Sequence, residues 1–175
     1  MKKNIILGVA FFLMSLQQLA AQNSIQPNAS VAKRFEESFE GAKNVQWVSL
    51  PKKVTQAQFG YKGGSWLAYF DDAGNLITFG RRVKSINDLP LKVQDGLRRA
   101  KSRLEKKSPA FEIAIIYEMM KDEATLYYVT MQNDASRATF SINTDGMAKL
   151  ENKKSRTVEP KVPKKAPKDA IARKN

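Results

Sequence analysis

The stretch AYFDDAGNLITFG, residues 68–80, sets two aromatic and β-branched runs on either side of Asp71-Asp72-Ala73-Gly74. Asp favours turns because its side chain accepts hydrogen bonds from the nearby backbone, and glycine supplies a positive φ. The pattern predicts a hairpin tip. Two adjacent carboxylates are also typical of a metal or catalytic site, so both alternatives have to be tested against the spacing.

The spacing does not fit a calcium loop, which needs oxygen ligands at alternate positions and a glutamate at the twelfth. Counted from Asp71, the third position is Ala73 and the twelfth is Arg82. A carboxylate pair for hydrolysis needs one acid with a raised pKa, and water at a hairpin tip keeps both acids ionised. The tip therefore predicts a turn.

The wider sequence gives little support to catalysis. The chain contains no histidine and no cysteine, which removes the usual general base at neutral pH and most zinc sites. A Ser-Lys dyad such as Ser102 with Lys106 remains formally open on a basic helix. The segment YKGGSW lacks the Gly-Lys-Ser ending of a phosphate-binding loop. We therefore expect no enzyme, no catalytic residue, no metal and no cofactor.

A second stretch resembles the first. SINTDGM, residues 141–147, aligns with YFDDAGN at an offset of 72 residues, with Gly146 on Gly74 and Asn143 on Asp71. Each is an apolar strand that ends in Asp or Asn, turns on a glycine and resumes. The second copy lacks the carboxylate pair, so the pair is not needed to make the turn.

The segments around the two stretches also repeat. Ser30 is a plausible N-cap for a helix with Val31, Phe35 and Phe39 on one face and Gly41 at its end. Four strands are predicted after it at 45–50, 54–62, 65–71 and 75–83. Asp88 then caps a second helix, and strands follow at 110–119, 124–132, 137–143 and 147–151. The expected fold is α+β: a tandem repeat of a helix plus about four antiparallel strands, with both helices packed on one face of the sheet.

The N-terminus indicates export. Residues 1–21 combine Lys2 and Lys3, an apolar run and a small-residue cleavage site after Ala21, as in a secretory signal peptide. The run is too short to cross a bilayer, and no other segment is long and apolar enough, so we expect no transmembrane segment. We expect a periplasmic or secreted protein with a linker at 22–29, a domain at 30–151 (units about 30–83 and 88–151) and a tail at 152–175.

The tail holds most of the positive charge. Lys and Arg outnumber Asp and Glu by 9 to 2 in residues 152–175, against 19 to 15 in residues 22–151. Three prolines and no aromatic residue predict a disordered, partly polyproline-like segment. It is either a solubilising tail or an electrostatic anchor for an anionic envelope polymer or lipid. The anchor residues would be Lys161, Lys164, Lys165 and Lys168. Without aromatics to stack on bases, specific nucleic-acid binding is not expected.

Aromatic residues are abundant in the first unit, and a short helix can cover only some of them. Each is a candidate core residue, since large aromatics are usually buried. Those left on the uncovered face of the sheet would form a binding surface. We predict a non-enzymatic binding module for an unidentified protein or peptide, with Trp66, Tyr69 and Tyr61 as contact residues.

The order of these segments resembles a known family. Helix, meander with YFDDAGNLI, DLPLKVQDGL, LYYVTM and FSINTDGMAKL together look like the secreted PepSY-like, or beta-lactamase-inhibitor-like, proteins of Bacteroidetes. The match spans about residues 30–151 and rests on Leu89, Pro90, Val93, Tyr128, Val129, Phe140, Asp145 and Gly146. The resemblance implies two helices on one side of an antiparallel sheet and, more loosely, inhibitor-like binding through the open face. The chain departs from the pattern in having no cysteine and in its basic tail.

Overall fold

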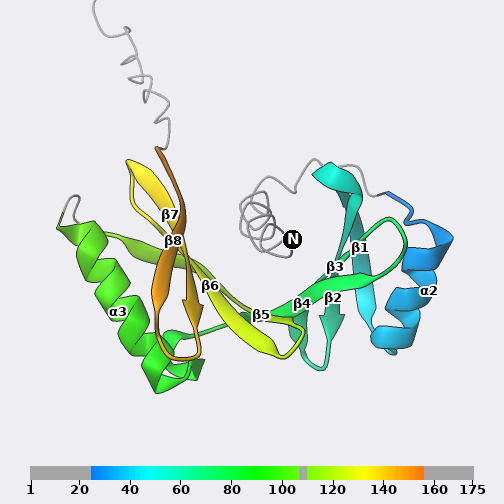
Figure 1. Cartoon of the computed structure of the whole chain (residues 1–175), viewed down its shortest axis with the longest axis horizontal. Helices are drawn as coiled ribbons and strands as arrows, with labels where there is room; N and C mark the ends of the chain where they lie inside the picture. The colour runs from blue at the N-terminus through cyan, green and yellow to red at the C-terminus, as the bar shows by residue number, and fades with distance from the viewer. Residues whose placement is uncertain (1–24, 107–109, 156–175) are drawn as a thin grey trace, which may run out of the picture.

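The computed structural model describes residues 25–106 and 110–155, which form two α-helices and one eight-stranded antiparallel sheet (Figure 1). Each strand pairs with the next in the chain, so the whole sheet is a meander. The strands are β1 (Lys43–Leu50), β2 (Val54–Tyr61), β3 (Gly64–Phe70), β4 (Leu76–Val83), β5 (Glu112–Lys121), β6 (Ala124–Gln132), β7 (Ser136–Asn143) and β8 (Ala148–Ser155). The α+β class and the antiparallel sheet are as predicted.

The first helix, α2 (Ala29–Ser38), begins earlier than predicted. The side chain of Asn28 accepts a hydrogen bond of 2.8 Å from the backbone N–H of Val31, so Asn28 is the N-cap and Ser30 lies inside the helix. The helix also ends earlier, at Ser38, because Phe39 already leaves the helical conformation. Gly41 follows with φ 79°, as the turn after a helix requires.

The second helix, α3 (Leu91–Glu105), is not capped by Asp88 as predicted. Pro90 occupies the N-cap position and gives no side-chain hydrogen bond. Asp88 instead ends a short 3₁₀ helix, Ile86–Asp88, where its carboxylate accepts the backbone N–H of Ser85 at 3.1 Å. Pro90 restricts the residue before it to extended conformations, which separates the two helical segments.

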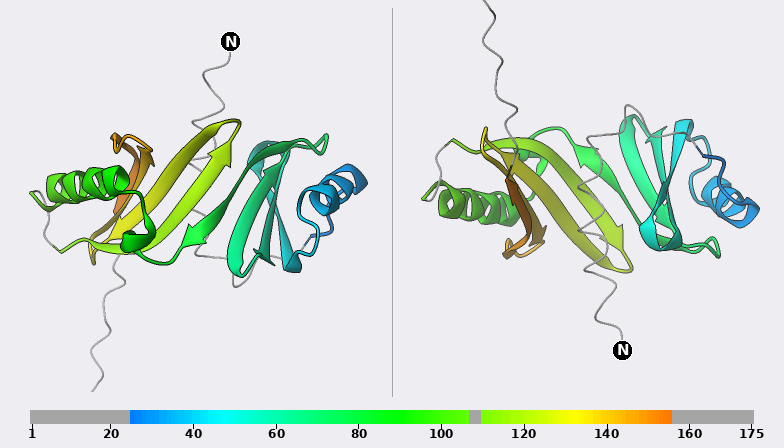
Figure 2. Two further views of the ribbon diagram at one scale, coloured as in Figure 1. Left: turned by 90° about the horizontal axis from the view of Figure 1, so that it is seen from below. Right: turned by 90° about the horizontal axis from the view of Figure 1, so that it is seen from above.

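Both helices pack on the same side of the sheet, the outer side of its curve (Figures 1 and 2). Val31 and Phe35 of α2, with Phe39 just after it, contact apolar side chains of β2 and β3. The α3 residues Val93, Leu97, Ala100 and Leu104 contact those of β5, β6 and β7. Register places Phe79, Met120, Ile116 and Val129 on this same side, across the junction of β4 with β5. The opposite face carries no helix within the described residues.

The two similar stretches, residues 69–75 and 141–147, form turns with matching hydrogen bonds. Asp71 Oδ1 accepts the backbone N–H groups of Ala73 and Asn75, at 3.0 and 2.8 Å. Asn143 Oδ1 accepts those of Asp145 and Met147, at 3.2 and 2.9 Å. The DDAG segment is therefore a hairpin turn, as predicted.

Each turn glycine lies against the first turn of a helix. Gly74, with φ 90°, would place a Cβ 2.8 Å from the carbonyl oxygen of Ser30 in α2. Gly146, with φ 79°, would place one against the carbonyl oxygen of Lys92 in α3. Each glycine thus allows the start of a helix to pack closely against a hairpin turn.

The last strand is longer than predicted. β8 continues to Ser155, and register pairs Lys154 with Arg137 and Ser155 with Ser136. Residues 152–155, predicted as the start of the tail, are therefore part of the sheet. Their backbone pairs with β7, and their polar side chains gave no sign of a strand in the sequence. The signal peptide and the remainder of the tail, with Lys161, Lys164, Lys165 and Lys168, lie outside the described residues.

Candidate functional site: the helix-free face of the sheet

The face of the sheet that no described helix covers, called here the open face, carries an apolar and aromatic cluster. Side chains alternate along each strand, so β3 presents Leu67 and Tyr69 on this face while Ala68 and Phe70 face α2. Its buried members, drawn from β1, β3, β5 and β6, are Val48, Leu50, Leu67, Tyr69, Tyr117, Met119 and Tyr128. The cluster therefore extends across the middle of the sheet, from β1 to β6.

Three tyrosines form the centre of this cluster. Tyr117 and Tyr128 are register partners on β5 and β6, and Tyr69 lies close enough for its charge to interact with both. Burial raises the pKa of the Tyr69 phenol well above its ordinary range, and the neighbouring Tyr117 and Tyr128 raise it further. Burial, followed by the charge of Glu151, raises the pKa of Tyr128 to about 12. All three phenols are neutral at physiological pH.

A pair of polar groups in the β2–β3 half has no partner. Gln56 and Tyr69 face each other across these strands, and both side chains are 2 % exposed. The Gln56 Nε2 and the Tyr69 hydroxyl are buried without a hydrogen-bond partner. An unmade hydrogen bond of a buried group costs about 1–3 kcal/mol. Two hydrogen-bond donors are therefore buried without a partner among the apolar side chains of the open face.

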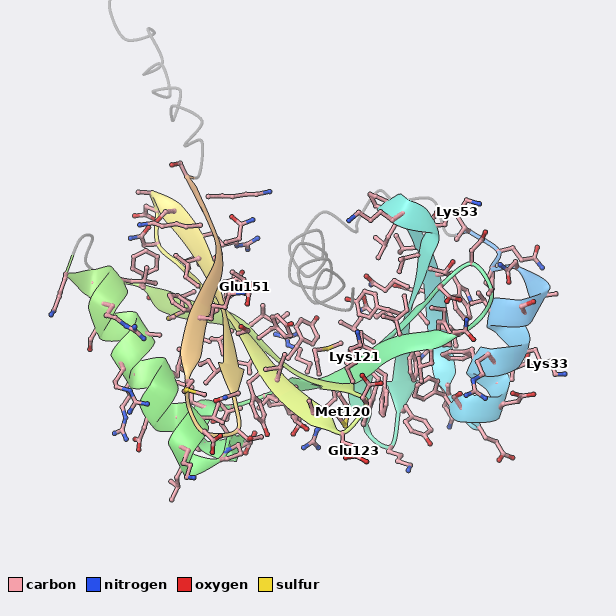
Figure 3. All side chains as sticks on the ribbon, viewed as in Figure 1. Lys33, Lys53, Met120, Lys121, Glu123 and Glu151 are labelled. Carbon is pink, nitrogen blue, oxygen red and sulfur yellow. The ribbon has the colours of Figure 1, made fainter. Side chains whose placement is uncertain are left out.

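In the β6–β8 half of the face, several polar groups are paired with one another. The hydroxyls of Thr130 and Thr139 lie 2.9 Å apart. The Ser141 hydroxyl donates to Glu151 at 2.6 Å, and Lys149 forms an ion pair with the same carboxylate at 3.2 Å. Glu151, labelled in Figure 3, lies on β8 on the side of the sheet away from α3.

The structure separates the three predicted contact residues. Tyr69 belongs to the open face, whereas Tyr61 and Trp66 pack at the margin of the α2 core. Their ring centroids are 5.7 Å apart, and Trp66 stacks on Phe79 at 6.3 Å. Trp66 and Tyr69 are three residues apart in one strand, so alternation alone puts them on opposite faces.

Sequence reasoning did not find Gln56, Tyr117 or Tyr128. Tyr128 is in the motif LYYVTM, but two adjacent tyrosines in a strand face opposite ways, and the motif does not reveal which faces water. Gln56 sits in VTQAQFGYK as one of two glutamines on the same face. Phe59 faces α2, so strict alternation along β2 places Gln56 on the other side of the sheet. The register of β2 with β3 then places Tyr69 on that side too.

The paired carboxylates at residues 71 and 72 have structural partners. Asn75 donates a side-chain hydrogen bond to Asp71 and, with nearby backbone N–H groups, lowers the pKa of that carboxyl. Asp72 forms an exposed ion pair with Lys53 at 3.3 Å. Within residues 25–106 and 110–155, no three His, Cys, Asp or Glu side chains lie together as metal ligands would. Nor does any helix in these ranges have the length and apolarity to cross a membrane.

Comparisons with known proteins place this fold. No protein-family model matches the sequence, and no curated protein matches it either. Among solved structures, a BLIP-like protein from Bacteroides fragilis is similar over 78 % of this chain and 92 % of its own, with a TM-score of 0.56 and 16 % identity. A DUF2874 family protein from Bacteroides ovatus matches over 75 % and 89 %, with a TM-score of 0.60 and 13 % identity.

A third similar structure comes from Bacteroides eggerthii and is named for an expected periplasmic location. It matches over 75 % of this chain and 90 % of its own, with a TM-score of 0.61 and 10 % identity. At these identities the likeness concerns the fold. The fold expected from the resemblance is confirmed: this chain has the architecture of the BLIP-like and DUF2874 proteins of Bacteroides.

Proposed function

We propose that the protein is a non-enzymatic binding module of the periplasm or cell exterior that engages a protein or peptide on the open face. The observation that carries this proposal is the Gln56–Tyr69 pair, two buried donors without partners within an aromatic floor. A partner that supplies a carbonyl or carboxylate acceptor would form the missing hydrogen bonds and so remove the free-energy cost of burying these donors without partners. Side-chain rotamer changes on binding are common, so such an acceptor can reach the pair.

The architecture supports this use of the face. We interpret the chain as two copies of one helix-plus-four-strand unit, on the evidence of the element order and of the matching turns at Asp71 and Asn143. Joining two such units edge to edge leaves one long concave face between their ends (Figure 1). The BLIP-like neighbour, together with the signal-peptide pattern of residues 1–21, is consistent with an exported, inhibitor-like module.

Capture from the envelope fraction of the source cells tests this function. The chain from Gln22 would be immobilised as wild type, Tyr69→Phe and Gln56→Leu, and bound proteins would be quantified by mass spectrometry. Tyr69→Phe keeps the ring and removes only the hydroxyl, so we expect retention of the partner to fall about tenfold. Trp66→Phe, on the α2 side, is the matched control and should capture as wild type does. Equal capture by all four proteins would refute binding at the pair.

A second candidate function is attachment to an anionic envelope polymer or lipid through the basic tail. It is favoured by the excess of seven positive charges in residues 152–175, where Lys161, Lys164, Lys165 and Lys168 lie. Binding of this kind weakens steeply with salt. Co-sedimentation of the chain with anionic vesicles at low and high salt, with and without residues 156–175, tests it. Salt-resistant binding by the shortened chain would exclude the tail as anchor.

A further inference from the structure

A groove of about 940 Å³ lies between α2 and β1. β1 is an edge strand of the sheet, with β2 on its other side. Its floor is aromatic: the rings of Phe35 and Trp47 meet edge to face at 5.0 Å, and Phe35 and Phe39 lie 5.4 Å apart. Residues 25–27 close one side. The groove is separate from the open face and from the Gln56–Tyr69 pair.

Trp47 of the edge strand β1 lines this groove. Ile25 donates its backbone N–H to the carbonyl of Trp47 at 3.3 Å, so Trp47 directs its backbone groups outward. The indole N–H of Trp47 has no hydrogen-bond partner among the described residues. An aromatic floor with an available indole N–H is what polyproline-type segments bind.

The rim of the groove is acidic. Glu36 lies on α2 and Glu40 lies two residues after its end, and no lysine or arginine is among the described residues that line the groove. Neither carboxylate has an ion-pair partner within the described ranges, whereas the neighbouring Glu37 pairs with Arg34 at 3.6 Å. Two carboxylates that line one groove repel each other. A cationic ligand would relieve that repulsion.

The chain itself contains a segment of matching chemistry. Residues 160–165 read PKVPKK, with prolines at 160 and 163 and lysines at 161, 164 and 165. In a polyproline helix, with three residues per turn, Pro160 and Pro163 share one edge, and Lys161 and Lys164 share another. One edge suits the aromatic floor, and the other suits the two glutamates.

Reach decides which copy supplies this segment. Pro163 is eight residues after Ser155, where β8 ends, and eight residues extend at most about 29 Å. β8 and β1 are the two opposite edges of the sheet, and seven strand spacings of about 4.8 Å separate them by about 34 Å along the sheet. The groove lies beyond β1, so the chain's own segment falls short of it.

We propose that residues 160–165 of one copy bind the α2–β1 groove of a second copy, with the prolines on Phe35, Phe39 and Trp47 and the lysines at Glu36 and Glu40. Two copies that exchange these segments form a closed two-fold pair. This self-association uses neither Gln56 nor Tyr69, so it stands or falls independently of the binding function proposed for the open face.

Charge reversal on each side tests the proposal in the chain from Gln22, with sedimentation velocity as the readout. Wild type should associate, and the groove variant Glu36→Lys/Glu40→Lys should weaken the association about tenfold or more, as should the tail variant Lys161→Glu/Lys164→Glu/Lys165→Glu. Mixed in equal amounts, the two variants should associate with each other again, because both groove–tail pairings are then of opposite charge. Glu37→Lys, outside the groove, is the control and should behave as wild type.

The contrary results are equally definite. A wild-type chain that stays monomeric across the concentration range overturns the proposal, and so does a mixture of the two variants that associates no better than each alone. Replacing Pro160 and Pro163 with alanine keeps every charge. If association survived that change undiminished, the aromatic floor would not be the binding site.

Discussion

Arg81 of β4 and Glu118 of β5 form an ion pair of 2.6 Å between the two central strands of the sheet. The other carboxylate oxygen of Glu118 accepts the Tyr127 hydroxyl at 3.1 Å. The Glu118 side chain is 18 % exposed and that of Arg81 55 %. One largely shielded carboxylate therefore joins β4, β5 and β6 in the middle of the sheet.

Glu118→Gln should lower the free energy of unfolding by about 1 kcal/mol, because it removes the charge from a pair that is only partly exposed to solvent. The matched control is Glu37→Gln, which breaks the exposed Arg34–Glu37 pair and should change stability by less than about 0.5 kcal/mol. Urea unfolding monitored by circular dichroism measures both. Equal losses would mean that the Arg81–Glu118 pair is no stronger than a surface pair.

Gly146→Ala should be much more damaging than Gly63→Ala. Both glycines have positive φ, 79° and 73°, so both substitutions carry the same conformational cost of about 1 kcal/mol. A Cβ at Gly63 meets nothing within 4 Å, whereas one at Gly146 overlaps the carbonyl oxygen of Lys92. Thermal unfolding should show a clearly larger fall for Gly146→Ala. Similar falls would show that the turn does not bear on the start of α3.

The two turns predict an asymmetric result at Asp71. Asp71→Asn should cost less stability than Asp71→Ala, since Asn143 makes the equivalent backbone hydrogen bonds in the second turn. Asp71→Ala removes the acceptor from two backbone N–H groups and should cost about 1 kcal/mol. Because the pKa of Asp71 is lowered in the folded chain, its contribution is present above its unfolded pKa and is lost as the pH falls. Acid unfolding of the three proteins checks both statements, and a large loss in Asp71→Asn would show that the charge matters more than the turn.

The sequence predicted what depends on local pattern. Glycine, Asp and Asn at residues 71–74 and 143–146 mark turns through chemistry confined to a few residues, and alternating apolar residues mark strands. The helix starts were less accurate because Asn28 and Ser30 are both good caps, and only the packed position of α2 decides between them. The extension of β8 to Ser155 depends on its pairing with β7. The polar sequence of residues 152–155 does not predict that pairing.

The candidate site was harder to predict, because a side chain's exposure depends on sheet register and curvature. Tyr69 was one of the three predicted contact residues, but the sequence did not reveal that it lies opposite Gln56 on a face apart from Trp66 and Tyr61. The α2–β1 groove involves residues 25–47 only and still could not be foreseen, since its opening is set by how far α2 stands from the sheet edge.

Removing the unpaired hydroxyl gives a direct test of the open face. Tyr69→Phe should leave the free energy of unfolding unchanged or raise it by about 1 kcal/mol, because the lost group makes no hydrogen bond. Tyr69→Ala should lower it by about 3–5 kcal/mol through the cavity that it leaves. Chemical unfolding of both variants measures the difference. A marked loss in Tyr69→Phe would show that the hydroxyl has a stabilising partner in the free protein.

Alkaline pH should destabilise the fold in a defined range. Burial raises the pKa of Tyr69, Tyr117, Tyr127 and Tyr128, to about 12 for Tyr128, so the folded chain holds these protons more tightly than the unfolded chain. Their contribution is therefore complete below about pH 9 and falls as the pH rises past about 10, by at most about 1.4 kcal/mol per tyrosine and pH unit. The thermal midpoint measured from pH 8 to pH 12, together with tyrosinate absorbance, follows this loss. Tyr128→Phe should flatten the decline, and a variant that declines as steeply as wild type would show that Tyr128 ionises without opening the cluster.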